Sequence, residues 1–168
     1  MTKPLSAAFI LARAGNLARW TRKPNPIQRT PDGLFRLLDD EFHFTLDAAA
    51  SALNAKCSRY FTRDDDGLGQ DWGCERVWLN PPFGRGLREW LRKAWEASRG
   101  GAVVVCLVPS ATDMGWWHDY VMLADEVRFI RGRIAFLAED GSRGSNAFFP
   151  VSIVVFRSRE TGERVSLL

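Results

Sequence analysis

The sequence predicts an α/β fold built on an open, mostly parallel sheet. Two observations support this prediction. Apolar segments of strand length alternate along the chain with segments of helical spacing, and one strand-length segment is a continuous apolar run of the kind buried in parallel sheets. The chain has 168 residues, of which 46% are hydrophobic and 12% aromatic, which suffices for one well-packed domain. We therefore expect a single domain over residues 29–168, preceded by a separate arm at residues 1–28.

The first half of the chain is expected to contain two helices and two strands. In order, these are a helix at 34–41, a strand at 42–47, a helix at 48–56 and a strand at 76–79. The two helices rest on helical spacing, and the first strand rests on alternation of apolar and polar residues. Three glycines between residues 67 and 73 mark an irregular stretch before the second strand.

The second half begins with a helix, because apolar side chains recur at helical spacing from Leu87 to Trp95 and Gly100 follows. Ala102 to Val108 is the continuous apolar run expected of a buried parallel strand. The remaining elements are predicted as a helix at 114–123 and strands at 127–130, 133–137 and 151–156. We expect the last two strands to be antiparallel neighbours across the loop at 138–150.

The most informative segment is the tetrapeptide Asn80-Pro81-Pro82-Phe83, which directly follows the strand at 76–79. Each proline fixes its own φ and pushes the residue before it toward extended conformations, so the Asn80 side chain and the carbonyls of residues 80 and 81 are held in place. Proline has no N–H, which makes this loop rich in acceptors, and Phe83 adds a flat apolar face. The loop therefore favours a planar ring that carries an amino group.

An exocyclic amine on a base is a weak nucleophile because its lone pair is delocalised into the ring. If the Asn80 side-chain oxygen and the Pro81 carbonyl each accept one amine hydrogen, the nitrogen is drawn toward tetrahedral geometry and its lone pair faces an electrophile. Phe83 would stack on the extruded base. The alternative interpretation is a turn that merely ends the strand.

This tetrapeptide resembles the Asn/Asp-Pro-Pro-aromatic signature of amino-methyltransferases that use S-adenosylmethionine. Over about residues 28–157 the chain is similar to the phage DNA N-6-adenine-methyltransferases, which are small solitary enzymes of phages and prophages. Besides the tetrapeptide, the resemblance rests on Thr30-Pro31, Leu34-Phe35, Phe44 to Ser51, Asn54, Cys57, Tyr60-Phe61, Asp66-Gly67-Leu68, Asp71-Trp72, Gly132 to Phe136 and Val151 to Phe156.

The resemblance implies a compact Rossmann-like methyltransferase fold, with a mostly parallel sheet and a C-terminal antiparallel strand pair. It implies transfer of a methyl group from S-adenosylmethionine to the 6-amino group of adenine in double-stranded DNA, with base flipping. The catalytic loop would be Asn80, Pro81, Pro82 and Phe83. The implied cofactor-binding residues are Thr30, Pro31, Asp47, Ala48, Ala49, Asp66, Asp71 and Trp72.

Individual roles follow from the same resemblance. The segments at Thr30-Pro31 and Asp47 would hold the methionine part of the cofactor, Asp71 would accept from its adenine amine, and Asp66 could reach a ribose hydroxyl. In one respect the chain departs from the larger methyltransferase group, because Asp47 to Ala50 replaces the usual glycine-rich cofactor loop. For Asp47 a helix N-cap is the alternative role, and for Asp71 an ordinary turn.

In an open parallel sheet, ligands bind at the carboxyl ends of the strands. Asp47 and Asn80 each lie at the end of a predicted strand. We therefore expect the two motifs to face one pocket on the same rim.

Charge is distributed unevenly along the chain. The formal net charge is +3, but the first 29 residues contain six basic and no acidic residues, which leaves −3 on the remainder. Such an arm could follow a phosphate backbone and add salt-sensitive affinity without sequence information. The alternative is a solvated terminus without a ligand.

No metal is expected, although Asp64-Asp65-Asp66 provides three adjacent carboxylates. Alternate side chains of an extended segment point apart, so a solvated acidic turn is the better interpretation. His43 and His118 lack a partner at helical spacing and are interpreted as structural. The cysteines at 57, 74 and 106 are odd in number and form no Cys-x-x-Cys pair, which favours reduced thiols in a cytosol over a disulfide frame or a zinc site.

The expected location is the cytoplasm of a bacterial host, with the gene carried by a phage or prophage. No segment approaches the roughly 18 to 20 continuous apolar residues of a membrane span. The apolar stretch from Leu5 to Ala12 is short, and Arg13 interrupts it too early for a secretion signal. We therefore expect a soluble protein with no membrane partner.

Other function classes stay open from the sequence. A metal-dependent nuclease would combine clustered aspartates with a basic arm, and a non-catalytic DNA-binding module would need the arm alone. The same chemistry could also act on RNA or on a protein amide, because the loop recognises a planar amine rather than a polymer. The chain has no room for a separate target-recognition domain, so loops near Arg85, Arg131 and 138–146 are expected to read the DNA.

Overall fold

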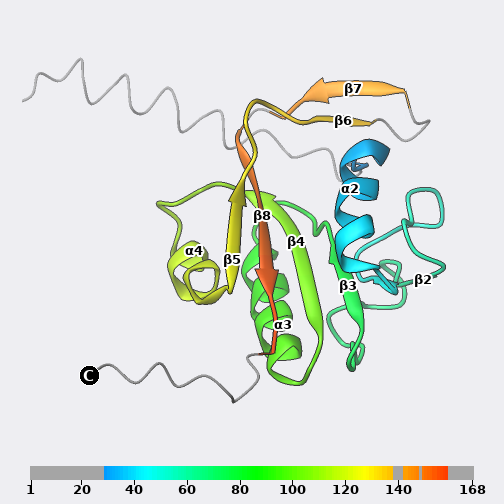
Figure 1. Cartoon of the computed structure of the whole chain (residues 1–168), viewed down its shortest axis with the longest axis vertical. Helices are drawn as coiled ribbons and strands as arrows, with labels where there is room; N and C mark the ends of the chain where they lie inside the picture. Colours follow the sequence, from blue (N-terminus) through cyan, green and yellow to red (C-terminus); the bar gives the residue numbers. More distant parts are fainter. Residues whose placement is uncertain (1–28, 138–141, 148, 159–168) are drawn as a thin grey trace, which may run out of the picture.

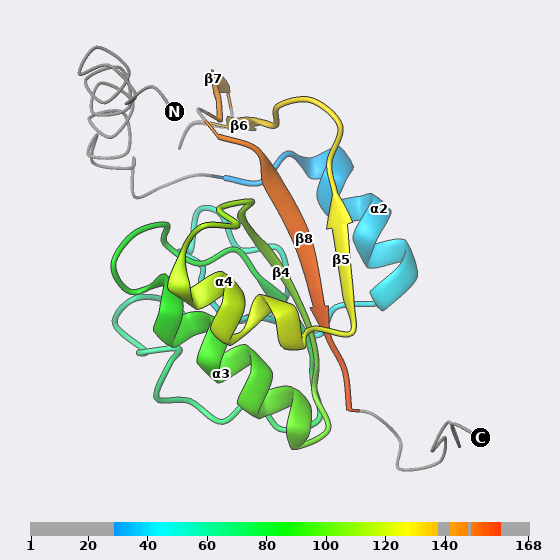
Figure 2. The same cartoon turned by 90° about the vertical axis from the view of Figure 1, so that its left-hand side faces the viewer.

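The structure is a computed structural model that describes residues 29–137, 142–147 and 149–158. One sheet lies between helix α2 on one face and helices α3 and α4 on the other (Figures 1 and 2). The elements in chain order are α2 (Asp32–Phe42), β1 (Leu46–Asp47), β2 (Arg59–Tyr60), β3 (Arg76–Leu79), α3 (Leu87–Arg99), β4 (Val103–Pro109), α4 (Gly115–Asp119), the 3-10 helix η1 (Val121–Leu123), β5 (Glu126–Phe129), β6 (Ala135–Leu137), β7 (Arg143–Asn146) and β8 (Val151–Phe156).

The main sheet has six strands in the order β2-β1-β3-β4-β8-β5. β1 pairs in parallel with β2 and β3, and β3 pairs in parallel with β4. β8 is antiparallel to both β4 and β5, so it alone runs against the other strands of this sheet. The predicted Rossmann-like methyltransferase fold, mostly parallel with antiparallel pairing at the C-terminal side, is confirmed.

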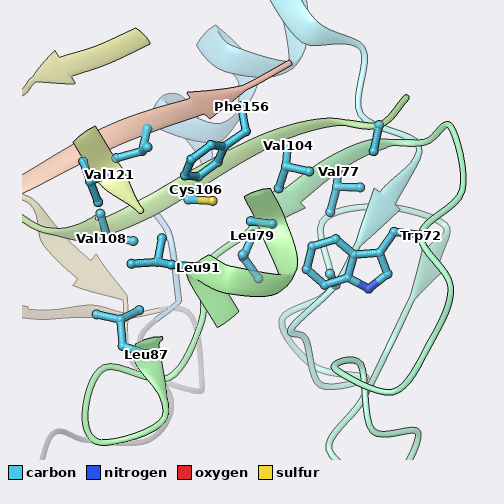
Figure 3. Packing of buried hydrophobic residues seen from close by; sticks show 14 of the residues in the cluster. Trp72, Val77, Leu79, Leu87, Leu91, Val104, Cys106, Val108, Val121 and Phe156 are labelled. Carbon is cyan, nitrogen blue, oxygen red and sulfur yellow. The ribbon is translucent and has the colours of Figure 1, made fainter. Parts of the chain in front are cut away.

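Side chains of the central strands point alternately to the two faces of the sheet, so the core forms two clusters. Val77 and Leu79 of β3 belong to the cluster beneath α3, whereas Trp78 belongs to the cluster beneath α2. Figure 3 shows the first cluster, in which Leu91 of α3 lies among buried strand side chains. Every residue of β8 is buried, as expected for a strand covered on both faces.

Two predictions near the first strand are wrong. The predicted strand at 42–47 is reduced to β1, because Phe42 ends α2 and His43 adopts a left-handed conformation with φ of 52°. Residues 48–56 form turns rather than a helix. The reason lies in the side chains: Asp47 accepts the N–H groups of Ala49 and Lys56, and Asn54 accepts that of Ser51. Such bonds compete with helical ones.

The predicted pairing of the last two strands is also wrong. β6 pairs with β7 in a separate two-stranded sheet, whereas β8 inserts between β4 and β5. All six residues of β8 are buried and five of them are apolar, which favours a central position, and β6 instead pairs with the nearby β7. The basic arm at residues 1–28 lies outside the described residues.

Within the part of the chain that the structure describes, no helix is long and apolar enough to cross a membrane.

Candidate active site

The alternation of side chains places Asp47 and Asn80 on the same face of the sheet. Asp47 lies opposite Trp78 in the parallel pairing of β1 and β3, and Asn80 follows Trp78 by two residues. Residues separated by two point to one face of a strand, so all three side chains face the α2 side. Both strands end here, which agrees with the rule that ligands bind at the carboxyl ends of parallel strands.

A narrow pocket confirms that these side chains converge. It is lined by Arg29, Thr30, Asp47, Ala49, Asn54, Lys56, Trp78 and Asn80. The enclosed volume is about 10 Å³, which is on the scale of one water molecule or one small polar group. Four of the predicted site residues therefore meet here, from segments separated by up to fifty positions in the sequence.

Asp47 is the buried carboxylate of this pocket, with only 3% of its surface exposed. Its Oδ2 accepts the backbone N–H of Lys56 at 3.0 Å, and its Oδ1 accepts that of Ala49 at 3.4 Å. Burial raises the pKa of Asp47 to about 6, although these two N–H groups favour the ionised form. The predicted N-cap role is excluded, because no helix follows Asp47.

Thr30 connects the start of α2 to the loop at residues 80–83. The Asn80 amide Nδ2 donates to Thr30 Oγ1 at 3.2 Å, and Thr30 is only 2% exposed. The next residue, Pro31, begins α2: its carbonyl accepts the N–H groups of Leu34 and Phe35, each at 3.1 Å. The helix start thus fixes the hydroxyl that holds the Asn80 side chain.

The rest of the loop joins the sheet to the β6–β7 hairpin. Pro81 is buried, Pro82 is exposed and Phe83 is half-buried. The Phe83 ring meets Phe136 of β6 at 6.1 Å and Phe149 at 5.7 Å between centroids, both in edge-on geometry. The hairpin lies beyond the end of the sheet at which β5 ends (Figure 1), and β3 ends at that same edge.

Five predicted cofactor residues do not line the pocket: Pro31, Ala48, Asp66, Asp71 and Trp72. Asp66 and Asp71 are exposed on turns, and Asp71 Oδ1 accepts the Gly73 N–H at 2.9 Å. Trp72 is 1% exposed within the core cluster beneath α3 (Figure 3) and donates from Nε1 to the Gly67 carbonyl at 2.9 Å. Ala48 is fully buried, and its N–H donates to the Trp78 carbonyl at 3.0 Å.

The pocket also contains residues that the site prediction omitted. By sequence, Arg29 counts only toward the charge of the first 29 residues, Trp78 belongs to an ordinary strand, and Lys56 belongs to a predicted helix that does not form. The Lys56 side chain is 8% exposed and pairs with Asp32 of α2, with its ammonium 5.7 Å from the Phe35 ring centroid. Strand alternation accounts for Trp78, but no periodic pattern marks Arg29 and Lys56, which irregular backbone brings to the pocket.

The sequence comparisons agree with this geometry. The family model described as DNA N-6-adenine-methyltransferase (Dam) matches residues 21–167, a range that contains the whole pocket and loop. The chain belongs to this family. The resemblance stated above for the phage enzymes is thereby confirmed.

Two phage proteins are among the relatives of this Dam-family chain. The DNA N-6-adenine-methyltransferase of Escherichia phage T1 is 28% identical over 157 residues, covering 90% of this chain and 63% of the relative. The DNA N-6-adenine-methyltransferase of Haemophilus phage HP1 is 28% identical over 134 residues, covering 77% of this chain and 78% of the relative. The chain thus spans less than two thirds of the T1 relative's length.

Proposed function

We propose that this Dam-family chain transfers a methyl group from S-adenosylmethionine to the 6-amino group of adenine in double-stranded DNA. The observation that carries this proposal is the pocket in which the Asn80 amide and the buried Asp47 carboxylate meet at the carboxyl edge of the sheet. The family match and the phage relatives support the same reaction.

Asn80 and Pro81 provide the acceptors for the target amine. The Asn80 Nδ2 donates to Thr30, which fixes the orientation of that amide. The Pro81 carbonyl lies next in a backbone that two prolines hold rigid. Two positioned acceptors direct the amine lone pair toward the methyl donor. Because these acceptors are already in place, they lower the barrier without having to move during the reaction.

S-adenosylmethionine fits the polar groups of the pocket. When bound, it supplies an electrophilic methyl group on a sulfonium. The Asp47 carboxylate has a favourable Coulomb interaction with a nearby cation, and its burial makes that interaction stronger than it would be in water. Thr30 and Ala49 line the pocket with this carboxylate, and Pro31 and Ala48 are their neighbours at the start of α2 and the end of β1. Trp72 supports the neighbouring turn through its bond to Gly67.

Phe83 would stack on an adenine that has left the duplex. Its edge-on contacts with Phe136 and Phe149 hold the ring in one orientation, which reduces the entropy lost on stacking. Arg85 follows directly in the chain, and Arg131 precedes β6, and both are exposed. Exposed arginines near the loop suit contacts to DNA phosphates.

The test is to express the full chain in cells that lack adenine methylation and to map modified adenines across the DNA. Asn80→Ala should lower methylation by about 100-fold or more, since one positioned acceptor is lost, while S-adenosylmethionine binding by calorimetry persists. Asn80→Asp keeps an acceptor oxygen and serves as the matched variant. Full methylation by Asn80→Ala, or modification of RNA with none in DNA, would refute the proposal.

A further inference from the structure

Arg29 carries a buried donor without a partner. Its Nε is buried and makes no hydrogen bond within the part of the chain that the structure describes. Buried donors in native proteins are nearly always paired, because leaving one unpaired is costly. Arg29 also lines the pocket, so a ligand bound there could pair with its guanidinium.

The backbone of Arg29 is fixed in place. Its N–H donates to the Leu137 carbonyl at 3.3 Å, and its own carbonyl accepts the Leu137 N–H at 2.9 Å. Thr30, which holds Asn80, is the next residue. The pairing with Leu137 and the neighbouring Thr30 fix the backbone of Arg29, so its side chain extends to the pocket from an anchored segment.

The two cations of the pocket differ in their pairing. Lys56 already forms an ion pair with Asp32. Arg29 forms no ion pair with a described residue and acts on Asp32 only as a minor Coulomb influence. Among the described residues of the pocket, Arg29 is thus the cation with an open donor, and Asp47 is the acid.

An anion and an open cationic donor in one narrow pocket are complementary to a zwitterion. The amino-acid end of S-adenosylmethionine carries an α-ammonium and an α-carboxylate, and guanidinium groups form strong charge-assisted bonds with carboxylates. The pocket is small, with room for a charged group of such a ligand rather than for a nucleoside. We propose that Arg29 binds the α-carboxylate and Asp47 the α-ammonium, an inference that rests on the proposed function.

The experiment compares ligands that differ by one charge. Calorimetry would measure binding of S-adenosylmethionine and of decarboxylated S-adenosylmethionine to the full chain. Arg29→Met should weaken the affinity for S-adenosylmethionine on the order of 10- to 100-fold, the size of a lost charged hydrogen bond. It should change the affinity for the decarboxylated ligand by less than about threefold. Arg29→Lys should fall between, because a lysine keeps the charge but loses the planar fork.

Arg36→Met is the matched control, because Arg36 is an exposed cation on α2 and its removal changes net charge equally. It should bind both ligands as the unchanged protein does. Thermal unfolding would verify that each variant is folded, and Arg29→Lys carries the test if Arg29→Met does not fold.

The outcomes separate the two proposals. If Arg29 variants bind S-adenosylmethionine as tightly as the unchanged protein, or lose both ligands equally, the inference about Arg29 is wrong while the proposed function stands. If the unchanged protein binds neither ligand and methylates no DNA, the proposed function itself fails.

Discussion

The backbone N–H of Lys56 donates to Asp47 Oδ2 at 3.0 Å and closes the loop between these residues onto the end of β1. The Lys56 side chain extends to the start of α2, where it pairs with Asp32. One residue therefore joins the loop, the strand and the helix that surround the pocket. The Asp47 carboxylate is held in a fixed, buried position, and its charge state depends on what binds beside it.

We expect cofactor affinity to increase with pH between about 5 and 6. The pKa of Asp47 is raised by burial from 3.8 to about 6, so the native state holds its proton more tightly than the unfolded state. As the pH rises toward 6, Asp47 ionises in the native state and the free energy of unfolding falls. A cation bound beside the carboxylate offsets this loss of stability. Affinity for S-adenosylmethionine should rise by up to about tenfold per pH unit and level off above pH 6 to 7.

Calorimetry across pH 5 to 7.5, in buffers of different ionisation enthalpy, would measure both the affinity and the protons released on binding. The Asp47→Asn variant should bind weakly and without this pH dependence, because it has no carboxyl to ionise. An affinity of the unchanged protein that stays flat from pH 5 to 7 would contradict this account of Asp47.

Thr30→Val should reduce kcat by roughly tenfold at saturating cofactor, in addition to any change in cofactor affinity. Valine fills the same volume but removes the acceptor that holds the Asn80 Nδ2, and loss of one such bond costs about 1 to 3 kcal/mol. Steady-state kinetics on DNA together with cofactor binding would separate the two effects. Thr30→Ser keeps the hydroxyl and should retain near-normal kcat, whereas an unchanged kcat in Thr30→Val would exclude a positioning role.

The sheet, and the edge at which the site lies, could be predicted from sequence because they follow from local patterns. The continuous apolar run at 102–108 predicted the buried strand β4 (Val103–Pro109). The strand at 76–79 and the proline-locked loop after it placed Asn80 at the carboxyl edge. Asp47 was expected on the same rim, and the register of β1 with β3 brings it there.

The remainder depended on interactions between distant segments. The segment of Lys56 suits a helix by sequence, yet the Asp47 side chain accepts the Lys56 N–H that such a helix would use for its own hydrogen bond. Arg29 gave no local signal at all, since its place is set by pairing with Leu137. The pairing of β8 with β4 and β5 likewise depends on the other strands of the sheet. It therefore could not be predicted from the sequence of β8 alone.

Phe83→Ala should lower kcat/KM on DNA by about 10- to 100-fold, since stacking of a base on an aromatic ring contributes about 1 to 3 kcal/mol. It should also lower the melting temperature, because the ring packs against Phe136 and Phe149. Phe83→Tyr should preserve most activity. Phe129→Ala is the matched control, because Phe129 is 72% exposed on the edge strand β5 and should affect neither quantity. Normal kcat/KM in Phe83→Ala would mean that the ring serves packing alone.

Gly67→Ala should destabilise the fold and weaken the cofactor site together. A Cβ at Gly67 would lie 2.3 Å from the Ala48 carbonyl oxygen, so the turn that carries Gly67 must move away from the residue next to Asp47. Overpacking of this kind typically costs about 1 to 3 kcal/mol. Urea denaturation would measure the loss of stability, and calorimetry the accompanying loss of S-adenosylmethionine affinity.

Gly33→Ala provides the comparison for this last prediction. Gly33 lies in α2, and a Cβ there meets no atom within 4 Å. Since alanine is favoured over glycine in helices by up to about 1 kcal/mol, this variant should be as stable as the unchanged protein or more so, with normal cofactor binding. Equal stability of the two variants would show that the turn at Gly67 accommodates a side chain, and that close packing against Ala48 does not fix the position of Asp47.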